Sequence, residues 1–287
     1  MSHYLSNLRD LEFNLFEVFG APDGGPHPVL GTGPFAEVDV DTARSFLAEV
    51  DRLAREDLAP SYASSDRNPP VFDPATHTAP VPEAFQRSYR ALMESEFWRL
   101  DLPAELGGTN APRMLWWSLA ELILGANAPI WMYASGPSFA HTLFVEGTPE
   151  QKQWARLFVD KQWGSTMVLT EPDAGSDVGA GRTRAVPQPD GSWHIEGVKR
   201  FITSGEHDLT GNIIHYVLAR PVGVDGAGGP GTKGLSLFIV PKFWVNEDGS
   251  LGERNGAFCT NIEKKMGIKG SATCEMTFGE RMPARGL

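Results

Sequence analysis

The sequence is poor in cysteine and in patterns that bind metals. Its 287 residues include only two cysteines, Cys259 and Cys274, which are too few for a disulfide framework. We therefore expect both to be reduced, partly buried strand residues of a cytosolic protein. The seven histidines have no spacing typical of metal ligands, and two cysteines fifteen residues apart do not make a zinc site. The sequence therefore predicts no bound metal.

Positive charge is also scarce. Lysine and arginine total 25 against 36 aspartates and glutamates, which gives a formal net charge of −11. A protein that binds nucleic acids in general needs a basic face for their phosphates. The composition therefore argues against nucleic-acid binding, although it leaves room for an anionic ligand held by a local basic cluster.

Long apolar runs are absent as well. The N-terminus has no basic segment followed by an apolar core, which a secretory signal requires. The most apolar stretch, residues 115–133, contains Glu121, Asn127 and Pro129, so we interpret it as a buried helix and its end, with no membrane span. Both absences favour a cytoplasmic protein. With 41% hydrophobic and 21% charged residues, the chain can bury a substantial core.

The first 164 residues have the pattern of a helical domain. Apolar residues recur at three- and four-residue spacing in residues 41–54, 83–100 and 111–124, and Asp41 is a candidate N-cap of the first helix. These spacings predict that each helix buries one face.

Two further segments complete this half. Thr148 fits an N-cap, Pro149 the first helical position and Gln151 the partner in a capping box, so a helix is expected from there to about Gln162. Prolines and turn residues crowd residues 61–82. That segment is therefore predicted to be an ordered connection without regular helix.

After Trp163 the pattern changes to short apolar runs separated by turn residues, which predicts an antiparallel sheet. The pair Asp190-Gly191 is a strong signal for a hairpin turn. Further strands are expected at residues 213–219, 235–240 and 274–278.

These patterns predict an α+β fold. An all-α N-terminal domain, residues 1–164, is followed by an antiparallel β-sandwich or barrel-like domain, residues 165–287. Residues 226–231 match G-x-G-x-x-G literally, but a dinucleotide-binding motif must lie between a strand and a helix. Here Pro230 intervenes and a strand follows, so we interpret residues 223–234 as a glycine-rich hairpin loop.

Two stretches in the second half carry candidate chemistry. In the first, an apolar strand ends at Met167-Val168-Leu169 and runs into the turn Thr170-Glu171-Pro172-Asp173-Ala174-Gly175-Ser176-Asp177. Small residues there let the backbone approach a ligand, and hydroxyls and amides are available to a polar ring edge and a phosphate. A surface turn capped by its own side chains is the alternative.

The second stretch, residues 197–204, reads Gly-Val-Lys-Arg-Phe-Ile-Thr-Ser. An aromatic at Phe201 and a hydroxyl at Thr203 are able to cover one face and one edge of a planar heterocycle. The alternative is an ordinary amphipathic strand. In that strand Val198 and either Phe201 or Ile202 point inward, while the basic pair Lys199-Arg200 is solvated.

Together the two stretches resemble the flavin-binding signature of the acyl-CoA dehydrogenase family. The resemblance continues at residues 102–108, 147–152, 233–238 and 265–271, and covers most of residues 85–280. It implies FAD as cofactor, touching Met167, Leu169, Thr170, Gly175, Ser176, Phe201, Ile202 and Thr203.

The resemblance also implies roles for four of these residues. Thr170 and Thr203 would hydrogen-bond the isoalloxazine edge, and Phe201 would lie beside the ring. Ser176 would sit where the flavin diphosphate meets the acyl-CoA and so would also bind substrate. Two positions depart from the family pattern: Phe201 is often Trp, and Asp173, usually a small residue, must point outward.

The implied reaction is α,β-dehydrogenation of acyl-CoA thioesters to 2-enoyl-CoA, with hydride transfer to FAD, as in fatty-acid β-oxidation. In the family the base is a glutamate on a C-terminal helical domain, a four-helix bundle. That glutamate is expected beyond Leu287, so no catalytic residue is named, and Glu171 is expected to serve structure. The implied partners are acyl-CoA, an electron acceptor that is itself a flavoprotein, and further copies in a homo-oligomer.

Several alternatives stay open. The chain is interpreted as an incomplete fragment of a dehydrogenase; the alternatives are a non-catalytic product that binds flavin or a partner, and an acyl-CoA oxidase, which shares these motifs. A local basic group is either a solvated face or a contact for the CoA phosphates. It comprises Lys199, Arg200, Lys264, Lys265 and Lys269.

Overall fold

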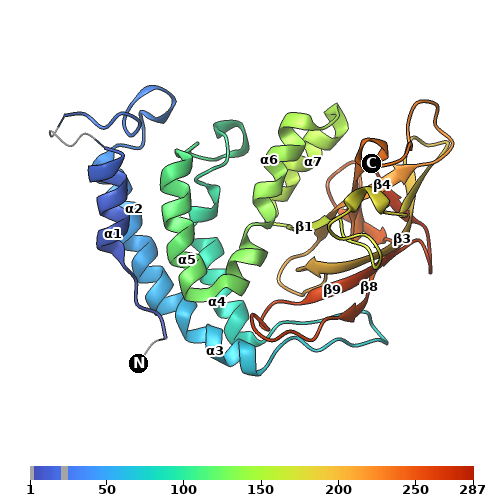
Figure 1. The fold of residues 1–287 in the computed structure, drawn as a ribbon, viewed down its shortest axis with the longest axis horizontal. Coiled ribbons are helices and arrows are strands. Elements are labelled where there is room, and N and C mark those ends of the chain that lie inside the picture. The colour runs from blue at the N-terminus through green and yellow to red at the C-terminus, as the bar shows by residue number, and fades with distance from the viewer. Residues whose placement is uncertain (1–2, 21–24) are drawn as a thin grey trace.

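In the computed structural model, which describes residues 3–20 and 25–287, helices come first and a β-sheet follows (Figure 1). The α-helices are α1 (Leu8–Glu12), α2 (Val40–Leu53), α3 (Ala59–Arg67), α4 (Glu83–Glu94), α5 (Arg113–Ala134), α6 (Phe139–Glu146) and α7 (Pro149–Asp160).

Helix α2 starts slightly earlier than its pattern predicts. Asp39, and not Asp41, is the N-cap, because its Oδ1 accepts the main-chain N–H of Thr42 at 2.8 Å. Asp41 then lies in the first turn, where its charge suits the helix dipole.

The expectation of no helix in residues 61–82 is wrong for the first part. Helix α3 continues to Arg67, because Pro60 lies in its first turn and follows a wider π-type turn at Ala54–Leu58. The remainder, residues 68–82, is an ordered connection that we call the strap. Its main chain closes on itself through a bridge between Asp73 and Thr78.

Two other helices differ in length from their patterns. Helix α4 ends at Glu94, short of residue 100, since Glu96 adopts a left-handed conformation with φ 59°. Helix α5 runs to Ala134, with a kink at Asn127 just before Pro129. The buried Asn127 amide donates to Leu58 O and Ser61 Oγ, both at 3.0 Å, and so pins the kink to the neighbouring helices.

The sheet order is β1-β4-β2-β3-β9-β8, with β5 beside β4 and β10 beside β3. Its strands are β1 (Gly164–Val168), β2 (Arg184–Pro187), β3 (Trp193–Thr203), β4 (Ile213–Pro221), β5 (Ser236–Pro241), β8 (Ala257–Ile262), β9 (Thr273–Phe278) and β10 (Ala284–Gly286). A separate ribbon pairs β6 (Phe243–Val245) with β7 (Leu251–Arg254).

The sheet is mixed. Most neighbours are antiparallel, including the β2–β3 hairpin around Asp190-Gly191, but β1–β4 and β2–β4 are parallel. The expectation of a purely antiparallel sheet is therefore wrong for these two pairs. A parallel pair needs a long crossover, and β2 and β3 both lie between β1 and β4 in the chain.

One apolar core joins the helices to the sheet. It contains buried residues of α2, α4 and α5 together with Ile214 and Tyr216 of β4. Tyr216 donates from its hydroxyl to Phe139 O at 2.9 Å, and the Tyr133 hydroxyl accepts the main-chain N–H of Ala272 at 2.8 Å. The division into domains at residues 164 and 165 matches the change from helix to strand, but it stays a prediction.

Among the residues described, no helix is both long and apolar enough to cross a membrane. Cys259 on β8 and Cys274 on β9 are free and buried.

Candidate functional site

The two sequence stretches meet at the end of β1. The main-chain N–H of Arg200 donates to Thr170 O at 2.8 Å, and Lys199 Nζ donates to Leu169 O at 2.9 Å. Residues thirty apart in the chain are thereby held side by side. The structure thus brings the turn after β1 and the end of β3 into one surface.

A buried ion pair holds this junction together. Lys199, which is 1% exposed, has its ammonium 2.9 Å from Glu171 Oε1. The Glu171 carboxylate also accepts the main-chain N–H groups of Arg182 at 2.6 Å and Thr183 at 3.0 Å. Burial alone would raise the pKa of Glu171, but the hydrogen bonds from Arg182, Thr183 and Lys199 outweigh it and lower that pKa. Glu171 is therefore committed to structure, as expected.

The interpretation of Lys199 and Arg200 as a solvated pair is wrong for Lys199, whereas the Arg200 side chain is partly exposed. Lys199 is buried against Glu171, and Arg200 forms ion pairs with Glu263 and, at 3.6 Å, with Glu275. These partners neutralise both side chains. Neither is left to contact the CoA phosphates.

A β-bulge decides which way Phe201 points. The pairing of β3 with β9 shifts between Lys199 and Ile202, and Phe201 takes a left-handed conformation with φ 60°. As a result Ile202 is buried at 2% exposure, whereas Phe201 is 57% exposed. The amphipathic-strand alternative places Val198 inward as well, but here Val198 is exposed.

The other predicted residues lie around this bulge. Met167 on β1 is 43% exposed, Thr203 at the end of β3 is exposed, and Leu169 and Thr170 are half-buried. Gly175 and Ser176 are exposed on the turn that follows the bridge between Glu171 and Ala174. Because the Ile202 side chain faces the core, only its main chain is available to a ligand.

Glycine is required at one position of the second stretch. A Cβ atom at Gly197 would lie 2.5 Å from Thr183 Oγ1 and 3.0 Å from Thr183 Cα. Strand β3 therefore packs directly on the residue that precedes β2. By contrast, Asp173 points outward as its position requires, with its nearest cation, Arg182, 3.9 Å away.

Sequence reasoning missed Arg220, at the end of β4. Its guanidinium donates to Gly179 O at 2.9 Å, to Gly231 O at 3.4 Å, and to Gly229 O. It thereby ties the turn after Ser176 to the glycine-rich loop. No local signal reveals this role, because the two loops are neighbours only in the folded chain.

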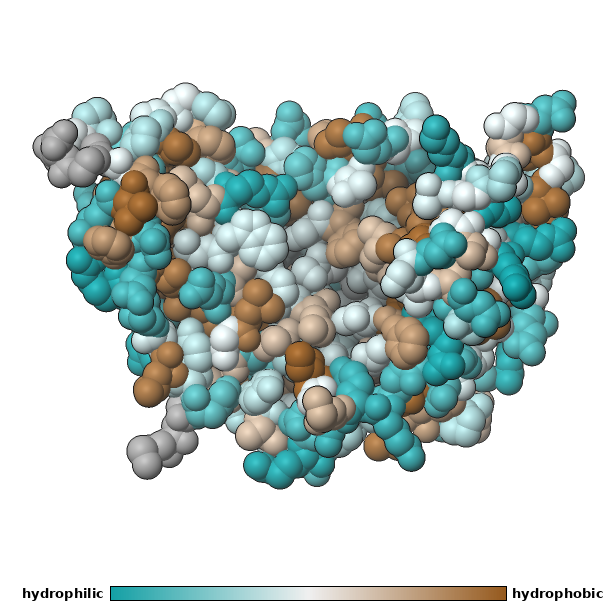
Figure 2. All heavy atoms as spheres, viewed as in Figure 1, coloured by the Kyte–Doolittle hydropathy of each residue, from teal (hydrophilic) through white to brown (hydrophobic). Residues whose placement is uncertain are grey.

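A cavity of about 300 Å³ opens beside Met167 and is lined by aromatic side chains that include Trp131, Phe139 and Tyr216. Figure 2 shows the molecule from one side: pale residues of intermediate hydropathy predominate in the middle of the face, and brown hydrophobic residues are scattered across it.

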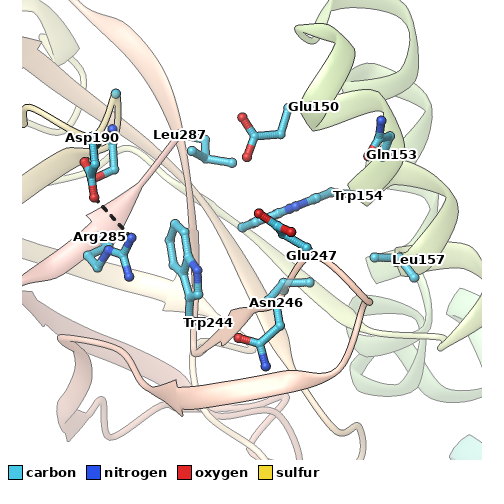
Figure 3. Close-up of a pocket in the computed structure, with 13 residues that line it drawn as sticks. Glu150, Gln153, Trp154, Leu157, Asp190, Trp244, Asn246, Glu247, Arg285 and Leu287 are labelled. Carbon is cyan, nitrogen blue, oxygen red and sulfur yellow. Dashed lines mark hydrogen bonds and ion pairs between the residues drawn. The ribbon is translucent and has the colours of Figure 1, made fainter.

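A larger cavity of about 710 Å³ lies away from both stretches (Figure 3). Trp154 of α7 and Trp244 of β6 meet there edge to face, with ring centroids 5.6 Å apart, and Arg285 pairs with Asp190 at 3.3 Å. It contains none of the predicted site residues, so we do not assign the candidate site to it.

Comparison of the chain with known proteins identifies similar families and relatives. Residues 166–280 match the family model described as acyl-CoA dehydrogenase, middle domain. The chain is 58% identical, over 289 residues, to the broad-specificity linear acyl-CoA dehydrogenase FadE5 of Mycobacterium tuberculosis, with 100% of this chain and 46% of that relative covered. Residues 166–280 therefore belong to the acyl-CoA dehydrogenase middle-domain family.

The chain is also similar to other acyl-CoA dehydrogenases. A butyryl-CoA dehydrogenase of Syntrophomonas wolfei is 35% identical over 291 residues, covering 98% of this chain and 45% of the relative. An acyl-CoA dehydrogenase from Bacillus anthracis, solved in complex with FAD, has the same fold, with a TM-score of 0.63 at 22% identity, covering 87% of this chain and 37% of that one. The chain spans less than half the length of the curated relatives it matches here.

Proposed function

We propose that this chain forms the helical and β-domain part of an acyl-CoA dehydrogenase that converts linear acyl-CoA thioesters to 2-enoyl-CoA. The observation that carries the proposal is the hydrogen bond from Arg200 N to Thr170 O, which joins the two flavin-signature stretches. Similarity to relatives named as dehydrogenases of linear acyl-CoA and butyryl-CoA supports the substrate class.

The residues at this junction fit FAD. Met167 near the end of β1 and Phe201 near the end of β3 are large apolar side chains left exposed, where a flat ring would cover them. The hydroxyls of Thr170 and Thr203 offer hydrogen bonds to the polar edge of such a ring. A Cβ at Gly175 would come no closer than 3.8 Å to Thr170, so the turn has room for a ligand.

When bound, FAD would accept the hydride from the β-carbon of the thioester. This chain's own residues bind and orient. In the proposal Phe201 lies beside the ring, Thr170 and Thr203 hold its edge, and Ser176 contacts the diphosphate and the acyl-CoA. The Lys199–Glu171 pair and Arg220 position these groups without touching substrate.

The catalytic base belongs to the proposal for the complete protein. Glu171 has its carboxylate occupied by one ammonium and two main-chain N–H groups, and therefore is not free to remove a proton. We propose that the base lies in the part of the complete protein that corresponds to the region of the curated relatives not covered by this chain. Assembly into a homo-oligomer and reoxidation by a flavoprotein acceptor are further parts of this proposal.

Flavin content tests the proposal. The complete protein should purify with bound flavin, whose absorbance bleaches when a linear acyl-CoA is added without oxygen. Phe201→Ala should weaken flavin binding about tenfold, the loss of one aromatic contact. Leu237→Ala, which removes a partly exposed side chain on β5, should leave it unchanged.

The outcomes separate clearly. A complete protein without flavin, or with flavin that acyl-CoA does not bleach, would overturn the proposal. Fast reoxidation by oxygen in place of a flavoprotein acceptor would assign an acyl-CoA oxidase.

A further inference from the structure

A third cavity, of about 550 Å³, lies between the strap and the β8–β9 hairpin. On the strap side its wall is Pro69, Pro70 and Phe72, and Ile262 and Ala272 face them from the hairpin. This volume is in the range of small-molecule sites. The walls offer flat apolar surface, which suits a planar ring.

Three lysines surround this apolar space. Lys264, Lys265 and Lys269 all line it, and within the described part of the chain none of the three forms an ion pair. The acid in the lining, Glu263, is already engaged by Arg200. In a chain of net charge −11, three cations without carboxylate partners around one cavity favour an anionic ligand.

Lys265 has a donor to spare. Its ammonium donates to Ile268 O at 2.6 Å and to Ser271 Oγ at 2.8 Å, which uses two of its three N–H groups. Both acceptors are neutral, and burial lowers the pKa of Lys265. The neighbouring acid, Asp66, accepts the main-chain N–H of Lys269 at 2.7 Å. A bound anion would accept the third N–H of the Lys265 ammonium and neutralise its charge.

The strap is anchored to the second half of the chain at two points that follow the cavity wall in sequence. His77 Nδ1 lies 2.7 Å from Cys259 O on β8, and the Phe72, His77 and Phe258 rings follow one another at 5.2–6.2 Å. Val81 N donates to Asp208 Oδ1 at 2.9 Å. These contacts hold the wall in place before any ligand arrives, which limits the ordering cost of binding.

We propose that this cavity binds a phosphorylated nucleoside, with its base against Phe72 and the two prolines and its phosphate near the three lysines. A free phosphate would leave the apolar walls unused, and an uncharged apolar ligand would leave the lysines unmatched. Base stacking on an aromatic side chain combined with cationic groups is a recurrent mode of nucleotide binding.

Two sources share this chemistry. One is the 3′-phosphorylated ADP end of a CoA thioester, which rests on the proposed function. The other is a free nucleotide such as ATP, which is independent of it.

Titration of the complete protein with 3′,5′-ADP, ATP and inorganic phosphate, followed by calorimetry, tests the site. Lys264→Gln/Lys269→Gln should weaken nucleotide binding at least tenfold. Lys152→Gln/Lys161→Gln, on α7 and at its C-cap, changes the net charge equally away from the cavity and should have no effect. Phe72→Leu keeps an apolar wall but removes the ring, and should weaken the nucleotides without affecting phosphate.

Competition then identifies the source. Displacement of 3′,5′-ADP by acyl-CoA would assign the cavity to the CoA end, and lysine-dependent binding of ATP that acyl-CoA does not displace would assign a separate nucleotide site. Nucleotide binding that is absent, or insensitive to Lys264 and Lys269, or no tighter than phosphate binding, would overturn the proposal. Because titration needs no turnover, its result is independent of flavin content and bleaching.

Discussion

Phe201 and Ile202 are adjacent residues with opposite surroundings, because the bulge in β3 reverses the side-chain alternation between them. We expect Ile202→Ala to lower the free energy of unfolding by about 2–5 kcal/mol, as removal of buried methyl groups does. Phe201→Gly should change it by less than about 1 kcal/mol, since Gly relieves the left-handed backbone and the lost ring is largely exposed. Urea-induced unfolding measures both values. A larger loss of unfolding free energy for Phe201→Gly than for Ile202→Ala would contradict the side-chain orientation that the bulge imposes.

Lys199 and Glu171 form the ion pair that joins the two stretches. Lys199→Met should cost about 3–5 kcal/mol, because it leaves the Glu171 carboxylate buried without its cation. Adding Glu171→Gln should recover part of that loss, since no net charge then stays buried. A double-mutant cycle in urea measures the coupling. A cost below about 1 kcal/mol for Lys199→Met would match a solvated pair and contradict burial of the two charges.

At the scale of elements, α7 is the clearest case of a helix specified locally. Thr148 Oγ1 accepts Gln151 N at 3.3 Å, and Gln151 Oε1 accepts Thr148 N at 2.9 Å, as the capping box predicts. Thr148→Ala should therefore lower the free energy of unfolding by about 1 kcal/mol. Thr142→Ala, on the exposed face of α6, should change the free energy of unfolding by no more than about 0.5 kcal/mol. Thermal or urea-induced unfolding measures both variants. Equal effects would show that the cap contributes nothing.

Helices α3 and α5 show the limit of local patterns at this scale. Pro60 and Pro129 break helices on average, yet α3 begins around the first and α5 continues through the second. At the α5 kink the side-chain amide of Asn127 donates to Leu58 O of the neighbouring helical segment. A sequence window contains no information on such partners.

At the scale of the whole molecule, the shared core makes the helices and the sheet depend on each other. Tyr216 of β4 is buried in the helical core, so the two parts should unfold together. Hydrogen exchange followed by mass spectrometry should give similar opening free energies for α5 and β4. A gap of more than about 2 kcal/mol would support two independent domains with a boundary at residues 164 and 165.

The buried imidazoles give this molecule a pH dependence. Burial, with help from Arg254 and Lys242, lowers the pKa of His215 from 6.5 to about 3. The unfolded chain binds a proton there near pH 6.5 and the folded chain does not, so stability falls as the pH drops from about 6.5 to 3. The slope from one such histidine is at most about 1.4 kcal/mol per pH unit.

Substitution of His215 isolates this contribution. His215→Gln should flatten the fall in unfolding free energy between about pH 6.5 and 4.5, measured by urea titration at several pH values. His194→Gln, at a partly exposed position on β3, is the matched control and should leave the slope unchanged. An unaltered slope in His215→Gln would mean that this imidazole is charged in the folded protein.

The sequence by itself determined the features that depend on neighbours along the chain. The α7 cap, the β2–β3 turn and the α+β class follow from residues a few positions apart, and the two stretches that resemble a flavin-binding signature are visible in the sequence alone. Local hydrogen bonds and hydrophobic periodicity depend on residues close in sequence, and therefore a short stretch of sequence is enough to predict them.

Only the tertiary structure decided how those pieces meet. Lys199 is buried because Glu171, twenty-eight positions away, neutralises it, and Phe201 points outward because β3 slips against β9. The parallel pairing of β1 with β4 and the lysine-rimmed cavity under the strap likewise depend on segments distant in sequence. Charge neutralisation and strand register are properties of contacts in space, and one chain segment does not specify its partner.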